Sequence, residues 1–385
     1  MNYNNPTPQQ AAGITRYSCG FLFLAFSFCY LFFLMGEVMA GVQYVFSGGL
    51  TEYSIPVGAV IIPIVLMAVQ WVVSKLLCLP NSAHILTYVP SFILLAMLSD
   101  LDRNVEGEFI WGMWRWLVPL ILVCWIMLIG YVKLPKGEDA MLHITPQSWL
   151  WPNYLGMMLM ICLTGFVSQA KDVEVYELKV ERLLMDKDYE GAAGVALKSY
   201  ASSPRLNQMR MYALARQGIL ADSLFSYPQY FGAKGLLDIT DVDTVSRFKT
   251  RRIETFLGAL PGNSIRNTER YLKVLCNDSV LANDNARQYL LCYLLLEKKV
   301  NDFETEFYKV YGDTIASDIP RAYQEALITR LPDLSPEFLP IYINKVYVER
   351  YNGYLAMKDS LTDATERKNL TRRQYGDSYW WYLDN

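Results

Sequence analysis

Long apolar runs dominate the first 169 residues of the chain, and an amphipathic pattern with many charged positions follows them. Five runs carry few charges, near residues 19–40, 55–77, 83–98, 109–132 and 149–167. A helix needs about 20 mostly apolar residues to cross a bilayer. The pattern therefore predicts an all-α protein with about five transmembrane helices. Residues 1–17 would form an N-terminal tail, residues 18–169 the transmembrane domain and residues 170–385 a soluble helical domain.

Two of the apolar runs have alternative interpretations. The third run, residues 83–98, is shorter than the others, so it is either a full span or a re-entrant segment. The first run follows Arg16 and ends near Ala40 in a sequence that resembles a signal-peptide cleavage site. Because its apolar core is long and further runs follow, we expect it to be retained as a signal-anchor.

Charged residues make up 19% of the chain, and they are distributed unevenly. Residues 1–169 contain six Lys or Arg and eight Asp or Glu, whereas 29 and 30 lie beyond them. The C-terminal part thus has the charge density of a soluble domain and a nearly neutral balance. Binding to nucleic acid needs a clear excess of Lys and Arg. The sequence therefore predicts the lipid bilayer as a partner, and no nucleic acid.

Helical periodicity continues through most of the C-terminal part. Residues 176–201 predict two amphipathic helices with a turn at 186–188, and a third helix ends at Gly218. Further helices are predicted at 243–259, 265–276, 285–299, 302–312, 319–331, 336–358 and 364–374. Residues 219–242 form a longer connection. The aromatic ending, residues 375–382, would pack on the last helices, anchor at a membrane surface or bind a partner.

One stretch of this region resembles a tetratricopeptide repeat. Residues 188–193 (DYEGAA) look like the start of the repeat's second helix, and Pro204 falls at the position of its proline. Residues 212–215 (YALA) look like the first helix of the next repeat, but Lys179 and Val180 stand where the family has Leu-Gly. The resemblance implies an α-solenoid that presents a concave surface to a protein or peptide partner.

The whole layout, together with the ending YGDSYWWY, also resembles uncharacterised bacterial multi-pass membrane proteins. This resemblance implies a location in the bacterial inner membrane and no particular activity.

Common catalytic and cofactor motifs are absent from the sequence. There is no GxxxxGK[ST], GxGxxG, GxSxG or Cys-x-x-Cys motif, and neither His84 nor His143 has a second His or a Cys at helical spacing. We therefore predict no catalytic residue, no metal and no cofactor. Cys276 and Cys292 lie in the soluble part; they would be free thiols by default, or a disulfide if that part is outside the cytosol.

Four polar residues form a candidate cluster at the outer ends of the predicted spans. They are Glu37, Asp100, Asp102 and Arg115. They would form an ion pair or a binding site, or lie as ordinary interfacial residues. The sequence favours a membrane-anchored interaction or scaffold protein whose helical domain binds a protein or peptide. The alternative is a transporter or a glycosyltransferase-like membrane enzyme with its site at this cluster.

Basic residues predict the orientation of the chain. Four lie on the side of the N-terminus and two on the other: Arg16, Lys75, Lys133 and Lys136 against Arg103 and Lys171. Because Lys and Arg favour the cytoplasmic side, the N-terminus is predicted to be cytoplasmic. With five spans the C-terminal domain then faces the periplasm.

A fusion experiment checks this orientation. Alkaline phosphatase fused after Asn385 should be active, and a fluorescent protein that folds only in the cytosol should stay dark there. The opposite pattern would mean an even number of spans and a cytoplasmic C-terminal domain.

Overall fold

The chain folds into two compact units. One consists of residues 1–178 and 244–247, and the other of residues 179–243 and 248–385. The computed structural model describes residues 8–99, 102–103, 109–134, 147–168, 172–197, 199, 201–240, 247–262, 265–278, 281, 283–312, 319–331 and 339–385. Each unit is considered by itself below.

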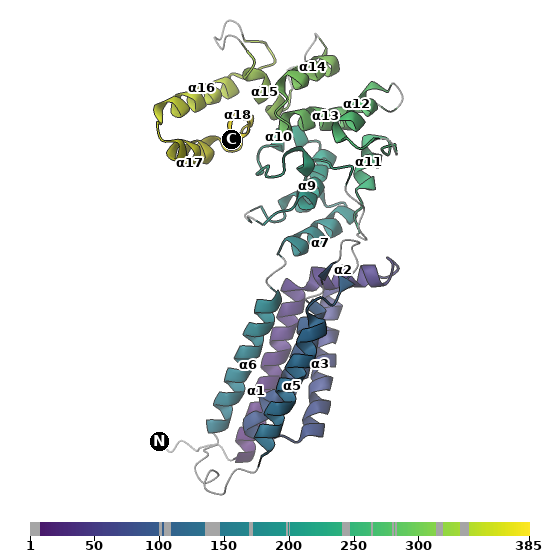
Figure 1. Cartoon of the computed structure of the whole chain (residues 1–385), viewed down its shortest axis with the longest axis vertical. Helices are drawn as coiled ribbons and strands as arrows, with labels where there is room; N and C mark the ends of the chain where they lie inside the picture. Colours follow the sequence, from purple (N-terminus) through teal and green to yellow (C-terminus); the bar gives the residue numbers. More distant parts are fainter. Residues whose placement is uncertain are drawn as a thin grey trace. The chain divides into compact units, whose positions relative to one another are not determined.

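The first unit is a bundle of long helices (Figure 1). Its elements are α1 (Pro8–Cys29), the π-helix η1 (Tyr30–Leu34), α2 (Gly36–Phe46), α3 (Ile55–Leu77), the 3₁₀-helix η2 (Asn81–Tyr88), α4 (Val89–Ser99), the two-residue strands β1 (Asp102–Arg103) and β2 (Phe109–Ile110), α5 (Trp114–Lys133) and α6 (Gln147–Ser168). The strands pair antiparallel. Helix α7 (Asp172–Met185) follows and contributes to both units.

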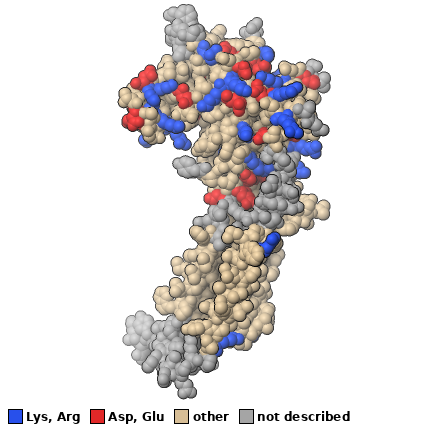
Figure 2. Space-filling model, viewed as in Figure 1, with Lys and Arg blue, Asp and Glu red and all other residues tan. Residues whose placement is uncertain are grey.

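Among the described residues of this bundle, four stretches are long and apolar enough to cross a membrane. They are Ala12–Leu34, Ile55–Leu77, Asn81–Leu98 and Trp114–Lys133; Leu150–Phe166, within α6, is a shorter apolar helix. Charged side chains are scarce on the visible surface of this unit and abundant on the other (Figure 2). The bundle is therefore compatible with a membrane location, while the number of crossings stays a prediction.

Two predicted spans have different limits in the structure. The run 19–40 is not one helix, because the chain leaves the helix at Met35 (φ −107°, ψ 2°) and α2 starts at Gly36. A Cβ at Gly36 would lie 2.7 Å from Ile55 Cγ2, so the close approach at this break needs glycine. The fourth run begins five residues later than predicted, at Trp114, because residues 109–110 pair as a strand.

The short third run is the most enclosed of the four stretches. About 67% of Asn81–Leu98 is buried, against 6% of an 18-residue apolar stretch within Trp114–Lys133. It packs against α1, α3 and α6, and Phe92 contacts Phe23 edge to face, with ring centroids 5.1 Å apart. A helix surrounded by other helices needs little lipid-facing surface, which explains how a short apolar run occupies this position.

Side chains from neighbouring helices satisfy the irregular backbone of η2. Asn153 of α6 accepts a hydrogen bond from Ile85 N (2.7 Å) and donates one to Asn81 O (2.9 Å). Trp125 Nε1 of α5 donates to Leu86 O (2.9 Å). Non-helical backbone at membrane depth is tolerated only where protein groups satisfy it. These two side chains therefore stabilise the start of the third apolar stretch.

A second polar contact joins α3 to the same segment. Gln70 is buried and donates from Nε2 to Thr87 Oγ1 (2.8 Å), and Thr87 Oγ1 donates to His84 O (2.7 Å). The strongly polar side chain in the middle of the second apolar run thus has a structural role in the bundle.

The second unit consists of short helices. After α7 come α8 (Tyr189–Gly194), α9 (Pro204–Gln217), α10 (Leu220–Ser223), the 3₁₀-helix η5 (Gly232–Gly235), α11 (Arg251–Leu257), α12 (Thr268–Asn277), α13 (Asp284–Leu296), α14 (Val300–Tyr311), α15 (Arg321–Ile328), α16 (Lys345–Ser360), α17 (Ala364–Tyr375) and α18 (Tyr379–Asp384). Helices α12 to α14 and α15 to α17 each pack on the next in sequence.

Local capping signals set several of these limits. Ser203 Oγ accepts a hydrogen bond from Leu206 N (3.0 Å), Pro204 follows at the first helical position, and α9 ends at Gly218 with φ 78°. The predicted turn at 186–188 lies between α7 and α8. Helix α8, however, ends at Gly194 after six residues, since Val195 is extended and Ala196 has φ 56°. The solenoid therefore stays a prediction.

Replacing Asn153 tests the role of η2 in the bundle. Asn153→Leu leaves the buried amide of Ile85 without its partner, at a cost of about 1–3 kcal/mol, and also removes the hydrogen bond to the partly buried carbonyl of Asn81. We expect a lower unfolding temperature in detergent than for Met158→Leu, a change at an exposed position of the same helix. Equal temperatures for the two variants would contradict the role given to Asn153.

Candidate functional site

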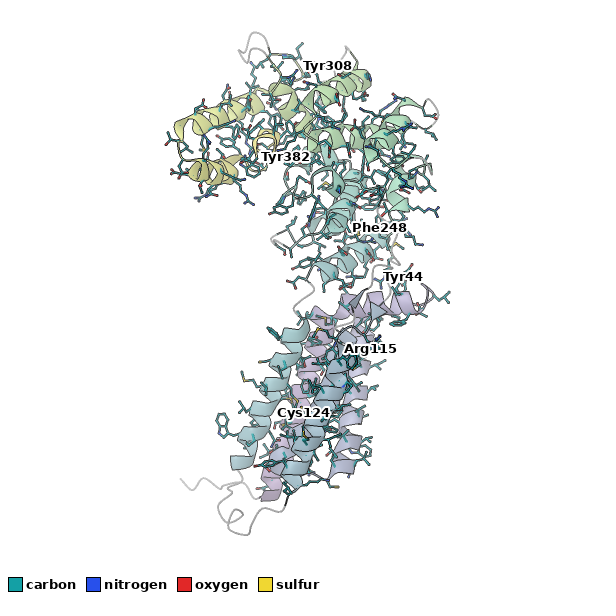
Figure 3. The ribbon with its side chains drawn as sticks, viewed as in Figure 1. Tyr44, Arg115, Cys124, Phe248, Tyr308 and Tyr382 are labelled. Atoms are coloured by element: carbon teal, nitrogen blue, oxygen red, sulfur yellow. The ribbon has the colours of Figure 1, made fainter. Side chains whose placement is uncertain are left out.

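The four residues of the sequence-predicted cluster are only partly described by the structure. Glu37 lies in the first turn of α2, and Arg115 is exposed in the first turn of α5 (Figure 3). No ion pair of Arg115 occurs among the described side chains. Asp100 lies outside the described residues; Asp102 belongs to β1, but its side chain lies outside them. The cluster therefore stays a hypothesis, as does the transporter or enzyme alternative.

A recess in the second unit offers a better defined site. It has a volume of about 240 Å³ and lies between the start of α14, the end of α15, one face of α16 and the last helix, α18. Its lining combines aromatic, aliphatic and charged side chains: Val300, Thr329, Arg330, Tyr351, Tyr354, Leu355, Lys358, Trp380, Leu383 and Asp384.

Trp380 forms the aromatic wall of the recess together with two tyrosines of α16. Its ring centroid lies 5.2 Å from that of Tyr351 and 6.4 Å from that of Tyr354, and only 2% of the residue is exposed. Its indole Nε1 is buried without a hydrogen-bond partner among the described residues. The aromatic ending thus packs on the preceding helices, as one of the sequence-based alternatives predicted.

A buried carboxylate holds the start of α18. Glu325 of α15 is 1% exposed; its Oε2 accepts a hydrogen bond from Tyr379 N (2.7 Å) and its Oε1 one from Arg321 Nε (2.7 Å). Burial raises the pKa of Glu325, and the charge of Arg321 opposes part of that rise. Negative charge at a helix N-terminus is favourable. Glu325 therefore stabilises α18 in its folded-back position.

Asp377 fixes the turn that precedes α18. Its Oδ2 lies 3.1 Å from Arg321 Nη2, and its Oδ1 accepts a hydrogen bond from Arg350 of α16. Burial acts to raise the pKa of Asp377, but the hydrogen bond from Arg350 and the charge of Arg321 outweigh it and hold that pKa below its ordinary value. The four side chains Arg321, Glu325, Arg350 and Asp377 form one ionic cluster, which joins α15, α16 and the last turn.

Charged groups at the recess are arranged in pairs. Lys358 Nζ lies 2.6 Å from Asp384 Oδ2, which also accepts a hydrogen bond from Tyr354 OH. Burial and this hydrogen bond raise the pKa of Tyr354 above its ordinary value. Arg330 Nε lies 3.3 Å from Glu304 Oε2. The recess thus offers a nearly neutral surface with donors and acceptors around aromatic rings.

Thiol and metal chemistry receive little support from the described residues. Burial raises the pKa of Cys292 to about 12 and that of Cys276 to about 11, which keeps both as unreactive thiols. Both are free of disulfides. Among the described ranges no group of three or more His, Cys, Asp or Glu side chains could hold a metal ion.

The recess lies in a part of the chain that matches a known sequence family. Residues 254–385 match a family of unknown function (DUF6057), and all ten lining residues fall within that range. No curated protein and no solved structure matches the chain. The C-terminal third of the chain is therefore similar to that family.

Asp377→Asn tests the ionic cluster. Asp377 is 43% exposed, so solvent screening limits the expected loss to about 1 kcal/mol of local stability, or roughly fivefold faster amide exchange in α18. Because the pKa of Asp377 is depressed, its contribution is present above about pH 4 and is lost as the pH falls through the depressed value. Hydrogen-exchange mass spectrometry of the full chain in nanodiscs measures this.

The control is Asp284→Asn, which removes a carboxylate with 98% exposure from a surface ion pair with Arg287. It should leave exchange in α18 unchanged. Equal exchange in α18 for wild type and Asp377→Asn would contradict the role assigned to the cluster.

Proposed function

We propose that this chain is a membrane-anchored interaction protein whose C-terminal helical unit binds a protein or peptide partner in the recess of α14, α15, α16 and α18. The apolar helices of the first unit would hold it in the inner membrane of a bacterium. By the orientation that the basic residues predict, the recess would then face the periplasm.

The size of the recess supports a peptide rather than a metabolite or cofactor. Its volume of about 240 Å³ is smaller than the range of roughly 300–1,000 Å³ that is common for small-molecule sites. A recess of this size suits one large side chain of a partner. This is the observation on which the proposal mainly rests.

The composition of the lining supports the same conclusion. Trp, Tyr and Arg are the residues that most often contribute binding energy at protein interfaces, and the recess contains Trp380, two tyrosines and Arg330. Because its charges are already paired, we expect an apolar or aromatic anchor side chain flanked by polar backbone groups. A strongly charged anchor would have to break the pair of Lys358 and Asp384.

The test is a selection of phage-displayed peptides on the full-length protein in nanodiscs. We expect enrichment of peptides that share an aromatic or aliphatic anchor. Leu355→Trp places a larger side chain in the recess and should abolish their binding. Leu370→Trp makes the same change on α17, outside the lining, at a residue that is 38% exposed, and should leave binding intact.

Two results would contradict the proposal. One is a selection that enriches no common anchor. The other is binding that Leu355→Trp and Leu370→Trp weaken equally, since a general loss of folding would then explain it. Circular dichroism of both variants separates folding from binding.

A further inference from the structure

An apolar crevice runs between three helices of the first unit. It has a volume of about 370 Å³ and is lined by residues of α4, α5 and α6. The lining is Val89, Phe92, Ile93, Ala96, Trp114, Leu117, Ile121, Met160, Leu163 and Thr164, in which Thr164 contributes the only hydroxyl. This volume falls within the range of about 300–1,000 Å³ that is typical of small-molecule sites.

The crevice lies beside the least enclosed helix of the bundle. Helix α5 exposes most of its side chains, among them Trp116 (80%) and Leu120 (62%). Little of its apolar stretch is buried inside the bundle. If these helices lie in a bilayer, the crevice continues the lipid-facing surface of α5. Water is unfavourable against such an apolar lining, and an empty crevice would forfeit its dispersion contacts.

A cationic residue outside the lining lies in the first turn of α5, the turn that borders the crevice. Trp114 and Leu117 line the crevice, and Arg115 lies next to Trp114 in the first helical turn. Arg115 is exposed and has no ion pair among the described side chains. The positive end of the α5 dipole lies at the same place. A guanidinium at this level of a span is stable when it reaches the interface and meets an anion.

We propose that this crevice is a binding site for one phospholipid, with an acyl chain along α4, α5 and α6 and the phosphate at Arg115. The apolar lining would contact the acyl chain, and the charge of Arg115 would attract the phosphate of the headgroup. By the predicted orientation the site lies in the outer leaflet. The inference rests on a bilayer location of the bundle and is independent of the peptide recess.

Photocrosslinking in nanodiscs tests the site. The full-length protein is reconstituted with phosphatidylglycerol that carries a diazirine in one acyl chain, and mass spectrometry maps the labelled residues after irradiation. Labels should be enriched several-fold on residues 89–96 and 117–121 over the lipid-exposed face of α3. An even distribution over all lipid-facing helices would overturn the proposal.

Three variants define the two parts of the site. Ala96→Phe fills the crevice and should reduce labelling there several-fold, with a smaller reduction for Ala96→Leu. Ala68→Phe, at an exposed position of α3, adds the same bulk elsewhere and should change nothing. Arg115→Gln should also weaken labelling of the crevice, while labelling of α3 stays constant as a check on insertion.

If labelling of the crevice is as strong in Ala96→Phe and Ala96→Leu as in the wild type, the proposal that an acyl chain occupies the crevice is overturned. An unchanged signal in Arg115→Gln would overturn the phosphate contact. The labelling pattern of the wild-type protein tests the site by itself, even if Ala96→Phe fails to insert into the membrane.

Discussion

The position of the last helix depends on the buried carboxylate of Glu325. That carboxylate accepts hydrogen bonds from the first amide of α18 and from Arg321, which also binds Asp377 in the preceding turn. A buried carboxylate without such partners would be strongly destabilising, because its lost hydration would not be compensated. Folding α18 back therefore satisfies the charge and at the same time brings Trp380 against α16. The recess has its aromatic wall only in this arrangement.

A similar constraint acts in the apolar bundle, on backbone groups instead of a charge. The 3₁₀ segment η2 lacks the regular hydrogen bonds of an α-helix, and Asn153 and Trp125 from two other helices complete its pairing. This pairing permits a short apolar run to occupy the most enclosed position of the bundle. In both units, polar groups that would be costly to bury determine which helices meet, and apolar packing fills the space around them.

The features that could be predicted are those that depend on residues close together in the sequence. The limits of α3 agree with the predicted run 55–77, and Gly218 ends α9 as its conformational freedom suggested. The sequence did not predict the break at Met35, beside which Gly36 approaches Ile55, a residue of another helix. The recess was not predicted either, because its lining is spread from Val300 to Asp384. Arg321 and Glu325 stand four residues apart, which is the spacing of a helical ion pair, but this spacing gives no sign that Glu325 is buried. Of the predicted polar cluster, the structure describes the side chains of Glu37 and Arg115 alone.

The proposal that the C-terminal unit presents its recess to a partner is tested most directly in living cells. A photoreactive phenylalanine analogue replaces Tyr351, which lines the recess, or Leu370, which lies outside it. Irradiation should produce a discrete crosslinked species of higher mass from position 351 and none from position 370. The absence of any protein crosslink at 351, or the same species from both positions, would contradict the account.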